Sequence, residues 1–257
     1  TSGGTTTSGG TTTGGTTTGG SAGNPLPAGS SAIETGSVSG ARTQNVQFGG
    51  ASGTVIVKTD NGFRRTFSAP TTDSNNLNVY TSGADTALTS RVGETSLGSK
   101  LDYTAFGAWN GKLLDATGNP TTSEAGAFFG GQYTPAAGIP ATGEASYAGG
   151  ALAAVGTGTS AETRTGSFTA TANFFANTVT GQATLGDLAV DFGQAAIARN
   201  RAAFDSATAS ANGGAYTGSM TGRFGGPAAE EIGGTFTLSG AQEVRGSFAG
   251  PRSSTTP

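Results

Sequence analysis

The chain of 257 residues contains neither cysteine nor histidine. Without cysteine it has no disulfide bond, no thiolate nucleophile and no zinc–thiolate site. Without histidine it lacks the commonest general base and the commonest metal ligand. Catalytic triads and dyads built on either residue are therefore excluded. The other side chains form no recognisable catalytic motif, and we interpret the chain as a protein that is not an enzyme.

Charged residues and long apolar runs are scarce as well. Charged residues make up 11% of the chain, with a formal net charge of −3 and a pI near 4.9. Nucleic-acid binding requires clustered Lys and Arg, and the densest basic cluster is the pair Arg64-Arg65, so we expect no nucleic-acid partner. No apolar run approaches the roughly 20 residues that span a bilayer. Membrane attachment would have to come from a lipid anchor upstream of Thr1.

The first 20 residues consist only of Thr, Gly and Ser. Such a composition offers nothing to bury, so we predict a disordered Thr/Gly-rich tether over residues 1–35; an ordinary disordered terminus is the alternative. The chain begins at Thr1 without a methionine. An upstream signal peptide followed by a lipidated cysteine would fit this start.

From Gly36 onward the sequence has β patterning. Residues Thr54–Lys58 and Phe63–Phe67 flank Asn61-Gly62, which predicts a hairpin with Phe63, Arg65 and Phe67 on one face. Residues 68–95 are rich in Asn, Thr, Ser and Asp and are expected to be mostly loop, with room for one short strand at Leu77–Tyr80. The run Leu101–Trp109 has Tyr, Phe and Trp three residues apart. That spacing suits a helical face as well as a strand, but the Thr and Gly content favours a strand.

The C-terminal half reads as a meander of strands that follows a Gly/Pro/Ala-rich passage at residues 130–143. Gln194–Phe204 is ambiguous, because part of it also suits a helical turn. Small residues at alternating positions would leave a barrel interior open or tightly wound. The pattern predicts an eight-stranded, antiparallel, up-and-down barrel, with strands at Ala145–Ala154, Thr163–Asn173, Thr178–Leu185, Leu188–Phe192, Ala202–Ala207, Ala215–Phe224, Ile232–Leu238 and Val244–Phe248.

The segment Tyr216–Phe248 contains a fixed corner. Gly225 and Gly226 permit a tight turn and Pro227 fixes φ where the chain leaves it. We expect a single helical turn at Ala228–Glu231 and a further bend at Gly233 and Gly234. The adjacent carboxylates of Glu230 and Glu231 allow two interpretations. Either one of them binds a cation or a basic partner surface, or one caps backbone N–H groups of the corner while the other is solvated; we favour the second.

Several Gly/aromatic segments, in this order, resemble the transferrin-binding protein B-like (TbpB-like) surface lipoproteins. Together they cover roughly residues 101–250, and the Thr/Gly-rich start is similar to the anchor peptide of these proteins. The segments are Leu101–Trp109, Tyr147–Gly150, Ser167–Phe174 with Val179-Thr180-Gly181, and the corner from Gly218 to Phe248.

The resemblance implies an all-β fold in which a small N-terminal β handle-like domain precedes an eight-stranded barrel. We place the handle-like domain at residues 36–140, the barrel at 141–252 and a tail at 253–257. The best-known family members carry two handle-plus-barrel lobes, whereas 257 residues allow one. This departure puts transferrin itself in doubt as the ligand.

The implied function is capture of a host protein or a haem-containing ligand, on the surface of a Gram-negative outer membrane or in secreted form. The resemblance also implies a TonB-dependent outer-membrane receptor as a further partner. Two alternatives are a structural or adhesive surface protein and a carrier of a small apolar ligand inside the barrel.

The sequence offers few candidate binding residues. Trp109, Phe128, Phe129 and Tyr133 lie in or beside predicted loops, and such aromatic residues are common anchors for protein partners; packing in a core is the alternative. Haem binding is possible only with a Tyr or Met220 as the axial ligand, and the sequence leaves this possibility open. We expect no other cofactor. We expect no metal site, because the pair Asp187 and Asp191 supplies fewer oxygens than calcium sites use.

Overall fold

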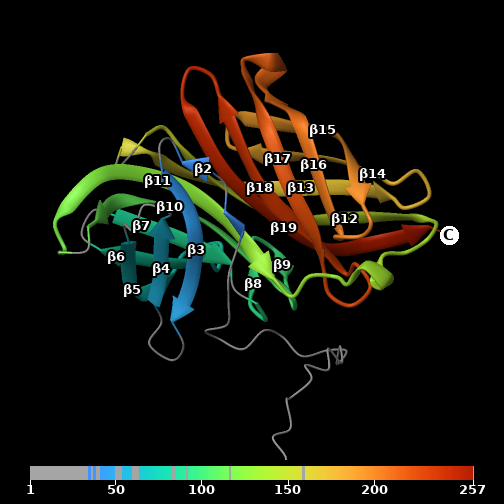
Figure 1. The fold of residues 1–257 in the computed structure, drawn as a ribbon, viewed down its shortest axis with the longest axis horizontal. Helices are drawn as coiled ribbons and strands as arrows, with labels where there is room; N and C mark the ends of the chain where they lie inside the picture. Colours follow the sequence, from blue (N-terminus) through green and yellow to red (C-terminus); the bar gives the residue numbers. More distant parts are fainter. Residues whose placement is uncertain are drawn as a thin grey trace, which may run out of the picture.

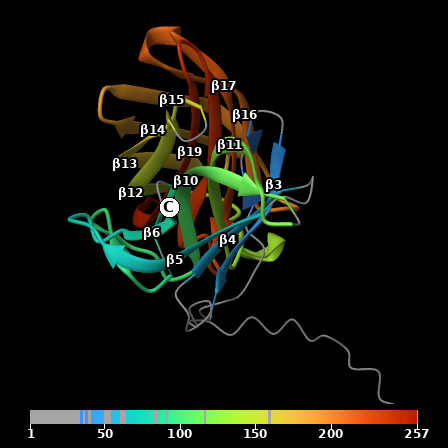
Figure 2. The ribbon, with the colours of Figure 1, turned by 90° about the vertical axis from the view of Figure 1, so that its left-hand side faces the viewer.

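The computed structural model describes residues 34–35, 37–38, 41–49, 54–59, 64–82, 85–90, 92–115, 117–157 and 160–256. The fold is all-β, and a curled N-terminal sheet is followed by a closed barrel (Figure 1). The turned view shows the sheet lying along one side of the barrel wall (Figure 2). The expected fold class is therefore confirmed.

The N-terminal sheet has nine strands in the order β1-β11-β10-β7-β6-β5-β4-β3-β2. It curls far enough for β10 to meet β5 as well, through the pair Leu114 and Arg64. Two short strands, β8 and β9, form a separate pair. The bounds are β1 Glu34–Thr35, β2 Ser37–Val38, β3 Ala41–Gly49, β4 Thr54–Thr59, β5 Arg64–Thr72, β6 Asn78–Ser82, β7 Asp85–Ser90, β8 Thr95–Ser96, β9 Ser99–Lys100, β10 Thr104–Leu114 and β11 Pro120–Gly131.

The expectations for this half are partly confirmed. The hairpin exists as β4 and β5, with Val55 opposite Phe67, while its turn and Phe63 lie outside the described residues. The aromatic run is a strand, β10, as favoured. The mostly-loop expectation for residues 68–95 is wrong, because the end of β5, β6 and β7 all fall there. Polar residues form these strands because pairing on both edges outweighs their weak β propensity.

The barrel is closed by eight antiparallel strands, each paired with its neighbour in sequence, and by the pairing of the first strand with the last. One turn of 3-10 helix, η1 (Ala136–Gly138), precedes it, and another, η3 (Asn212–Gly214), connects two strands. The bounds are β12 Glu144–Val155, β13 Glu162–Asn173, β14 Thr178–Leu185, β15 Leu188–Ala198, β16 Ala203–Ala211, β17 Tyr216–Gly225, β18 Glu231–Ser239 and β19 Glu243–Thr256.

All eight predicted strands occur, and β15, β16 and β19 extend well beyond their predicted C-terminal ends. The ambiguous stretch Gln194–Phe204 is not helical: β15 continues to Ala198, and β16 begins at Ala203. Residues 253–256, expected as a tail, continue β19, and Ser254 pairs with Ser146 of β12. The last strand must reach this far because β12 begins at Glu144, which is paired with Thr256.

Phenylalanines fill the barrel interior. Seven of them are buried in its core together with Leu, Val, Ile and Ala side chains. The ring of Phe248 lies at the centre, 4.4 Å from the centroid of Phe168 and 4.7 Å from that of Phe192. Among the described residues these side chains occupy the interior of the barrel, which argues against the small-ligand carrier. The seven are Phe168, Phe174, Phe192, Phe204, Phe224, Phe236 and Phe248.

Glycine on a neighbouring strand makes room for several of these rings. Phe204 is opposite Gly222, and Phe236 is opposite Gly246. A β-carbon at either glycine would overlap the phenylalanine ring across from it. The ring covers the backbone that glycine leaves bare, a pairing that fixes strand register. The many glycines of the strands are thus matched to the aromatic core.

Truncation of Phe248→Ala should lower the free energy of unfolding by about 3–5 kcal/mol, because it leaves a cavity among packed rings. The measurement is urea denaturation monitored by circular dichroism. Phe175→Ala is the matched control, because Phe175 is 79% exposed and its loss should change stability by less than about 0.5 kcal/mol. Equal effects of the two substitutions would contradict the packed interior.

Candidate functional site

The predicted corner joins β17 to β18 at one end of the barrel. Gly225 ends β17, residues 226–229 form a turn, and Glu231 already belongs to β18. Gly226 has φ +81°, where glycine carries no penalty, and Ala229 has φ +59°. The expected helical turn at Ala228–Glu231 is therefore absent. The turn is held from within, because the Ala228 N–H donates to the Glu230 carboxylate at 2.7 Å.

Glu231 joins the barrel to the N-terminal sheet. Its side chain is 2% exposed and accepts hydrogen bonds from the backbone N–H groups of Asp102 and Tyr103 and, at 2.6 Å, from the Thr104 hydroxyl. The corner interpretation was right that one glutamate caps the turn, namely Glu230, and wrong that the other is solvated. Burial raises the pKa of Glu231 and outweighs the hydrogen bonds that lower it.

The contact between the N-terminal sheet and the barrel, which we call the seam, extends on both sides of Glu231. The Thr134 N–H donates to the carbonyl of Phe224 at 2.9 Å, and the Ser247 hydroxyl donates to the carbonyl of Gly107 at 2.8 Å. The ring of Phe129 packs against Gly233, where a β-carbon would overlap it. The expected bend at Gly233 and Gly234 is absent, because both lie within strand β18, and Gly233 receives a side chain from the sheet. The two β-structures are packed and hydrogen-bonded together.

Two of the aromatic residues predicted to anchor a ligand, Phe129 and Tyr133, pack in the cluster that joins the sheet to the barrel. Trp109 is in β10, Phe128 and Phe129 are in β11, and all three are at most 2% exposed. Tyr133 is half-buried, and the guanidinium of Arg223 lies 4.7 Å from its ring centroid. The expectation that Phe128 and Phe129 lie in a loop is wrong, because β11 was missed in the sequence. Trp109 lies in the strand that was predicted, and there its side chain is buried. Contact of the four residues with a ligand stays a prediction.

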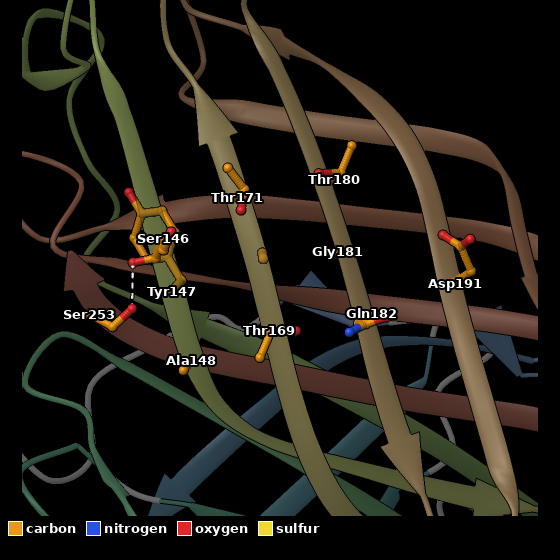
Figure 3. Close-up of a pocket in the computed structure, with 11 residues that line it drawn as sticks. Ser146, Tyr147, Ala148, Thr169, Thr171, Thr180, Gly181, Gln182, Asp191 and Ser253 are labelled. Atoms are coloured by element: carbon orange, nitrogen blue, oxygen red, sulfur yellow. Dashed lines mark hydrogen bonds between the residues drawn. The ribbon is translucent and has the colours of Figure 1, made fainter. Parts of the chain in front are cut away.

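A polar hollow of about 420 Å³ lies on the outer wall of the barrel. Figure 3 shows Thr169, Thr171, Thr180 and Gln182 on neighbouring strands around it, with Asp191 at one side. The hollow is open to solvent, and its exposed side chains offer hydroxyl and amide groups. Such a surface forms hydrogen bonds but has no aromatic platform.

Phe175, the exposed large hydrophobic residue of the described chain, was missed in the sequence. It lies in the turn between β13 and β14, beside a second hollow of about 420 Å³. An inward-facing Phe174 precedes it, so the pair reads in sequence as one core element. The hollow is lined by Thr142, Gly143, Glu144, Asn173, Phe175 and Thr256.

The turn that carries Phe175 is held rigidly. The Arg199 guanidinium donates to the carbonyl of Phe174 at 3.1 Å, to the Asn177 side chain at 2.9 Å and to the carbonyl of Pro140 at 2.6 Å. The Asn173 side chain accepts the Ala176 N–H at 2.7 Å. Phe175 is therefore presented to solvent on a fixed backbone, as a pre-organised contact residue would be.

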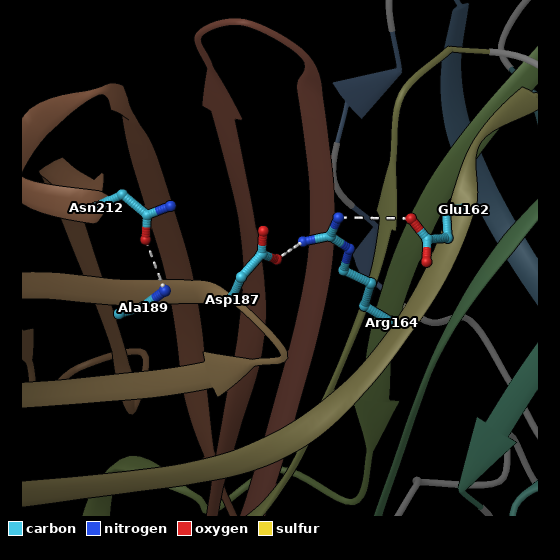
Figure 4. A network of polar contacts seen from close by, with 5 residues as sticks. All are labelled: Glu162, Arg164, Asp187, Ala189 and Asn212. Atoms are coloured by element: carbon cyan, nitrogen blue, oxygen red, sulfur yellow. Dashed lines mark hydrogen bonds and ion pairs between the residues drawn. The ribbon is translucent and has the colours of Figure 1, made fainter.

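Among the described residues, no group of three or more acidic side chains gathers as a metal site would require. Asp187 is paired with Arg164 (Figure 4), and Asp191 accepts the N–H of Gly193 at 2.8 Å, so the two carboxylates act separately. Tyr147 is buried and donates to the carbonyl of Ala229 at 2.8 Å, and its burial raises its pKa. Met220 is buried in the core. Neither residue is arranged to ligate haem.

In the described part of the chain, no helix has the length and apolar character needed to cross a membrane.

The raised pKa of Glu231 makes stability depend on pH. The unfolded chain loses this proton at a lower pH than the folded chain, so the free energy of unfolding falls as pH rises through that window. Glu231→Gln removes the titration. We expect the stability of the native protein relative to this variant to decline from acidic to neutral pH, by ~1.4 kcal/mol for each pH unit that separates the folded from the unfolded pKa. Urea denaturation of both proteins across a pH series measures it, and a difference that rises with pH would contradict the assignment.

Comparison with protein-family models matches residues 139–252 to the C-lobe and N-lobe β-barrels of transferrin-binding protein B (TbpB). Comparison with curated proteins gave no match. Among solved structures, HpuA of Kingella denitrificans, determined in complex with human haemoglobin, is 16% identical. The similarity covers 91% of both chains with a TM-score of 0.53, which shows a shared fold.

Two TbpB structures are also similar. TbpB of Haemophilus parasuis is 14% identical with a TM-score of 0.48, over 84% of this chain and 54% of that one. TbpB of Neisseria meningitidis is 14% identical with a TM-score of 0.47, over 82% and 52%. The chain thus spans about half the length of these proteins.

The matched segment, residues 139–252, begins just before β12 and ends within β19, so it contains the closed barrel almost completely. TbpB-like proteins bind ligands and are not enzymes. The chain is TbpB-like, and its barrel belongs to the family of transferrin-binding protein B β-barrels.

Proposed function

We propose that this protein captures a host iron-carrying protein on its outer surface, at the surface of a Gram-negative cell. The observation that carries the proposal is the filled barrel. Its interior holds packed phenylalanine rings, so a ligand must be recognised from outside, and an outer surface suits a macromolecule better than a small molecule. The likeness to HpuA, solved with human haemoglobin, supports the same class of ligand.

The proposal includes the remaining expectations from the sequence. With the extents that the structure gives, the N-terminal sheet from β1 onward would act as a handle-like domain and the strands up to the end of β19 as the barrel. The residues that precede β1 would tether both to a lipid anchor. The captured protein would be handed to a TonB-dependent receptor. The seam at Glu231 supports joint action, because it joins the two β-structures through a buried carboxylate.

Phe175 is the contact residue that this proposal favours. It combines 79% exposure with a backbone fixed by Arg199 and an adjacent hollow. Aromatic side chains of this kind dominate the energetics of protein interfaces. The carboxylate of Glu144 borders the hollow, so the partner surface would combine an apolar pocket with a basic group.

The test is binding of immobilised protein to human haemoglobin and human transferrin, measured by surface plasmon resonance. We expect specific binding of one of them. Phe175→Ser should weaken it roughly tenfold or more, because truncation of an interface anchor costs above about 1.4 kcal/mol. Phe175→Leu is the matched control, since it keeps an apolar side chain and should bind nearly as well as the native protein.

The outcomes test separately whether Phe175 is the contact residue and whether the protein captures an iron-carrying host protein. Binding that is unchanged in Phe175→Ser would exclude Phe175 as the anchor and leave capture intact. Retention of neither host protein would overturn capture of iron-carrying proteins itself.

A further inference from the structure

The sequence contains three Asn–Gly pairs, at residues 61–62, 110–111 and 212–213. Asn61 and Gly62 lie outside the described residues. The structure places the other two pairs in opposite surroundings, one within strand β10 and the other in the exposed turn η3. This difference bears on a reaction that asparagine undergoes without an enzyme.

Asparagine followed by glycine can lose ammonia spontaneously. The backbone nitrogen of the glycine gives up its proton to solvent and bonds to the side-chain carbonyl carbon, which closes a five-membered ring. The bond from that carbon to the side-chain amide nitrogen breaks, the nitrogen takes up a proton and leaves as ammonia, and the ring that remains is a succinimide. Water then opens the ring at either carbonyl, giving aspartate or isoaspartate. Glycine favours the attack because it has no β-carbon in the way and its backbone rotates freely.

Asn110 is protected from this reaction. Its side chain is 8% exposed, its oxygen accepts the Thr86 N–H at 3.1 Å, and its nitrogen donates to the carbonyl of Ala161 at 2.7 Å. Its backbone is paired on both sides, opposite Ala125 and Thr86. The bond of the amide nitrogen to Ala161 and the strand pairing on both sides would have to break before this asparagine could reach the attack geometry.

Asn212 has the opposite environment. Its side chain is exposed, and Gly213 and Gly214 follow with φ +67° and +95°. A β-carbon on either glycine would meet nothing within 4 Å, so the backbone has open space in which to rotate. The Asn212 carbonyl accepts one long backbone bond, from the Ala215 N–H at 3.4 Å, so less must break here than in β10 to bring the Gly213 nitrogen onto the Asn212 side chain.

The one hydrogen bond of the Asn212 side chain to the described residues favours the reaction. The Ala189 N–H donates to its oxygen at 2.9 Å (Figure 4). Attack on the carbonyl carbon places negative charge on that oxygen, and a fixed N–H donor stabilises the charge as in an oxyanion hole. The amide nitrogen, which departs as ammonia, makes no hydrogen bond within the described part of the chain.

We propose that Asn212 is a site of spontaneous deamidation, in which Gly213 supplies the attacking nitrogen and the products are aspartate and isoaspartate.

The products change this end of the barrel in two ways. A carboxylate at position 212 adds negative charge near Asp187, which already shares the guanidinium of Arg164 with Glu162 (Figure 4). Isoaspartate also lengthens the backbone by one carbon and shortens the side chain by one. It therefore breaks the bond to Ala189, which joins the β16–β17 turn to the start of β15.

The experiment follows both pairs in one sample. The intact protein is incubated in mildly alkaline buffer, digested with trypsin and mapped by mass spectrometry, with electron-based fragmentation to distinguish isoaspartate. Cleavage after Arg201 and Arg223 yields peptide 202–223, whose only asparagine is Asn212. Cleavage after Lys100 and Lys112 yields peptide 101–112, whose only asparagine is Asn110. The second peptide is the internal control.

We expect progressive loss of unmodified peptide 202–223 with gain of both products, while peptide 101–112 stays unmodified. Gly213→Ala should slow the loss, since its β-carbon hinders the attack, and Asn212→Gln should nearly abolish it, since the ring to be closed is larger. Asn212→Asp adds the negative charge but keeps the normal backbone. Isoaspartate would therefore be identified by hydrogen exchange at the Ala189 N–H that is faster in aged native protein and unchanged in this variant. Equal modification of the two peptides, or an unchanged rate in Gly213→Ala, would overturn the proposal.

Discussion

The contact on which the rest of the structure depends is that between inward-facing phenylalanine and glycine on the next strand. Phe204 over Gly222 and Phe236 over Gly246 set the register of neighbouring strands. They also let seven rings share one narrow interior. Because these rings occupy the interior of the described barrel, the partner recognition that we propose falls to its outer surface. The core thereby limits the kind of function the fold can have.

The same packing of phenylalanine on glycine occurs at the seam between the two β-structures. Phe129 of the sheet packs on Gly233 of the barrel much as Phe204 packs on Gly222. Beside it, the buried Glu231 binds the backbone that leads into β10. A carboxylate is costly to bury without a cation, but three donors of the sheet satisfy it only when the sheet is in place. The seam thus combines apolar packing with hydrogen bonds that form in only one arrangement of the two β-structures.

Much of the barrel could be predicted from the sequence, because its strands alternate between buried and exposed residues and are separated by Gly or Asn turns. The failures have physical causes. β11 carries SEAGAFFGG, whose small residues give little alternation, so Phe128 and Phe129 were expected in a loop. Residues 68–95 are polar, and only pairing within the sheet makes β6 and β7 strands. Phe175 could not be told from Phe174, because burial at a turn depends on loops elsewhere in the chain, here Thr142 to Glu144.

The closure of β12 on β19 joins the first strand of the barrel to the last, with Glu144 opposite Thr256 and Val155 opposite Val244. Every other pairing in the barrel is between strands adjacent in sequence. During synthesis the growing sheet therefore keeps two open edges until its final strand has emerged. Open edges are templates for intermolecular pairing, and closure over the whole length of the barrel is slow. The barrel strands of the nascent chain are therefore open to intermolecular pairing from the emergence of β12 until that of β19.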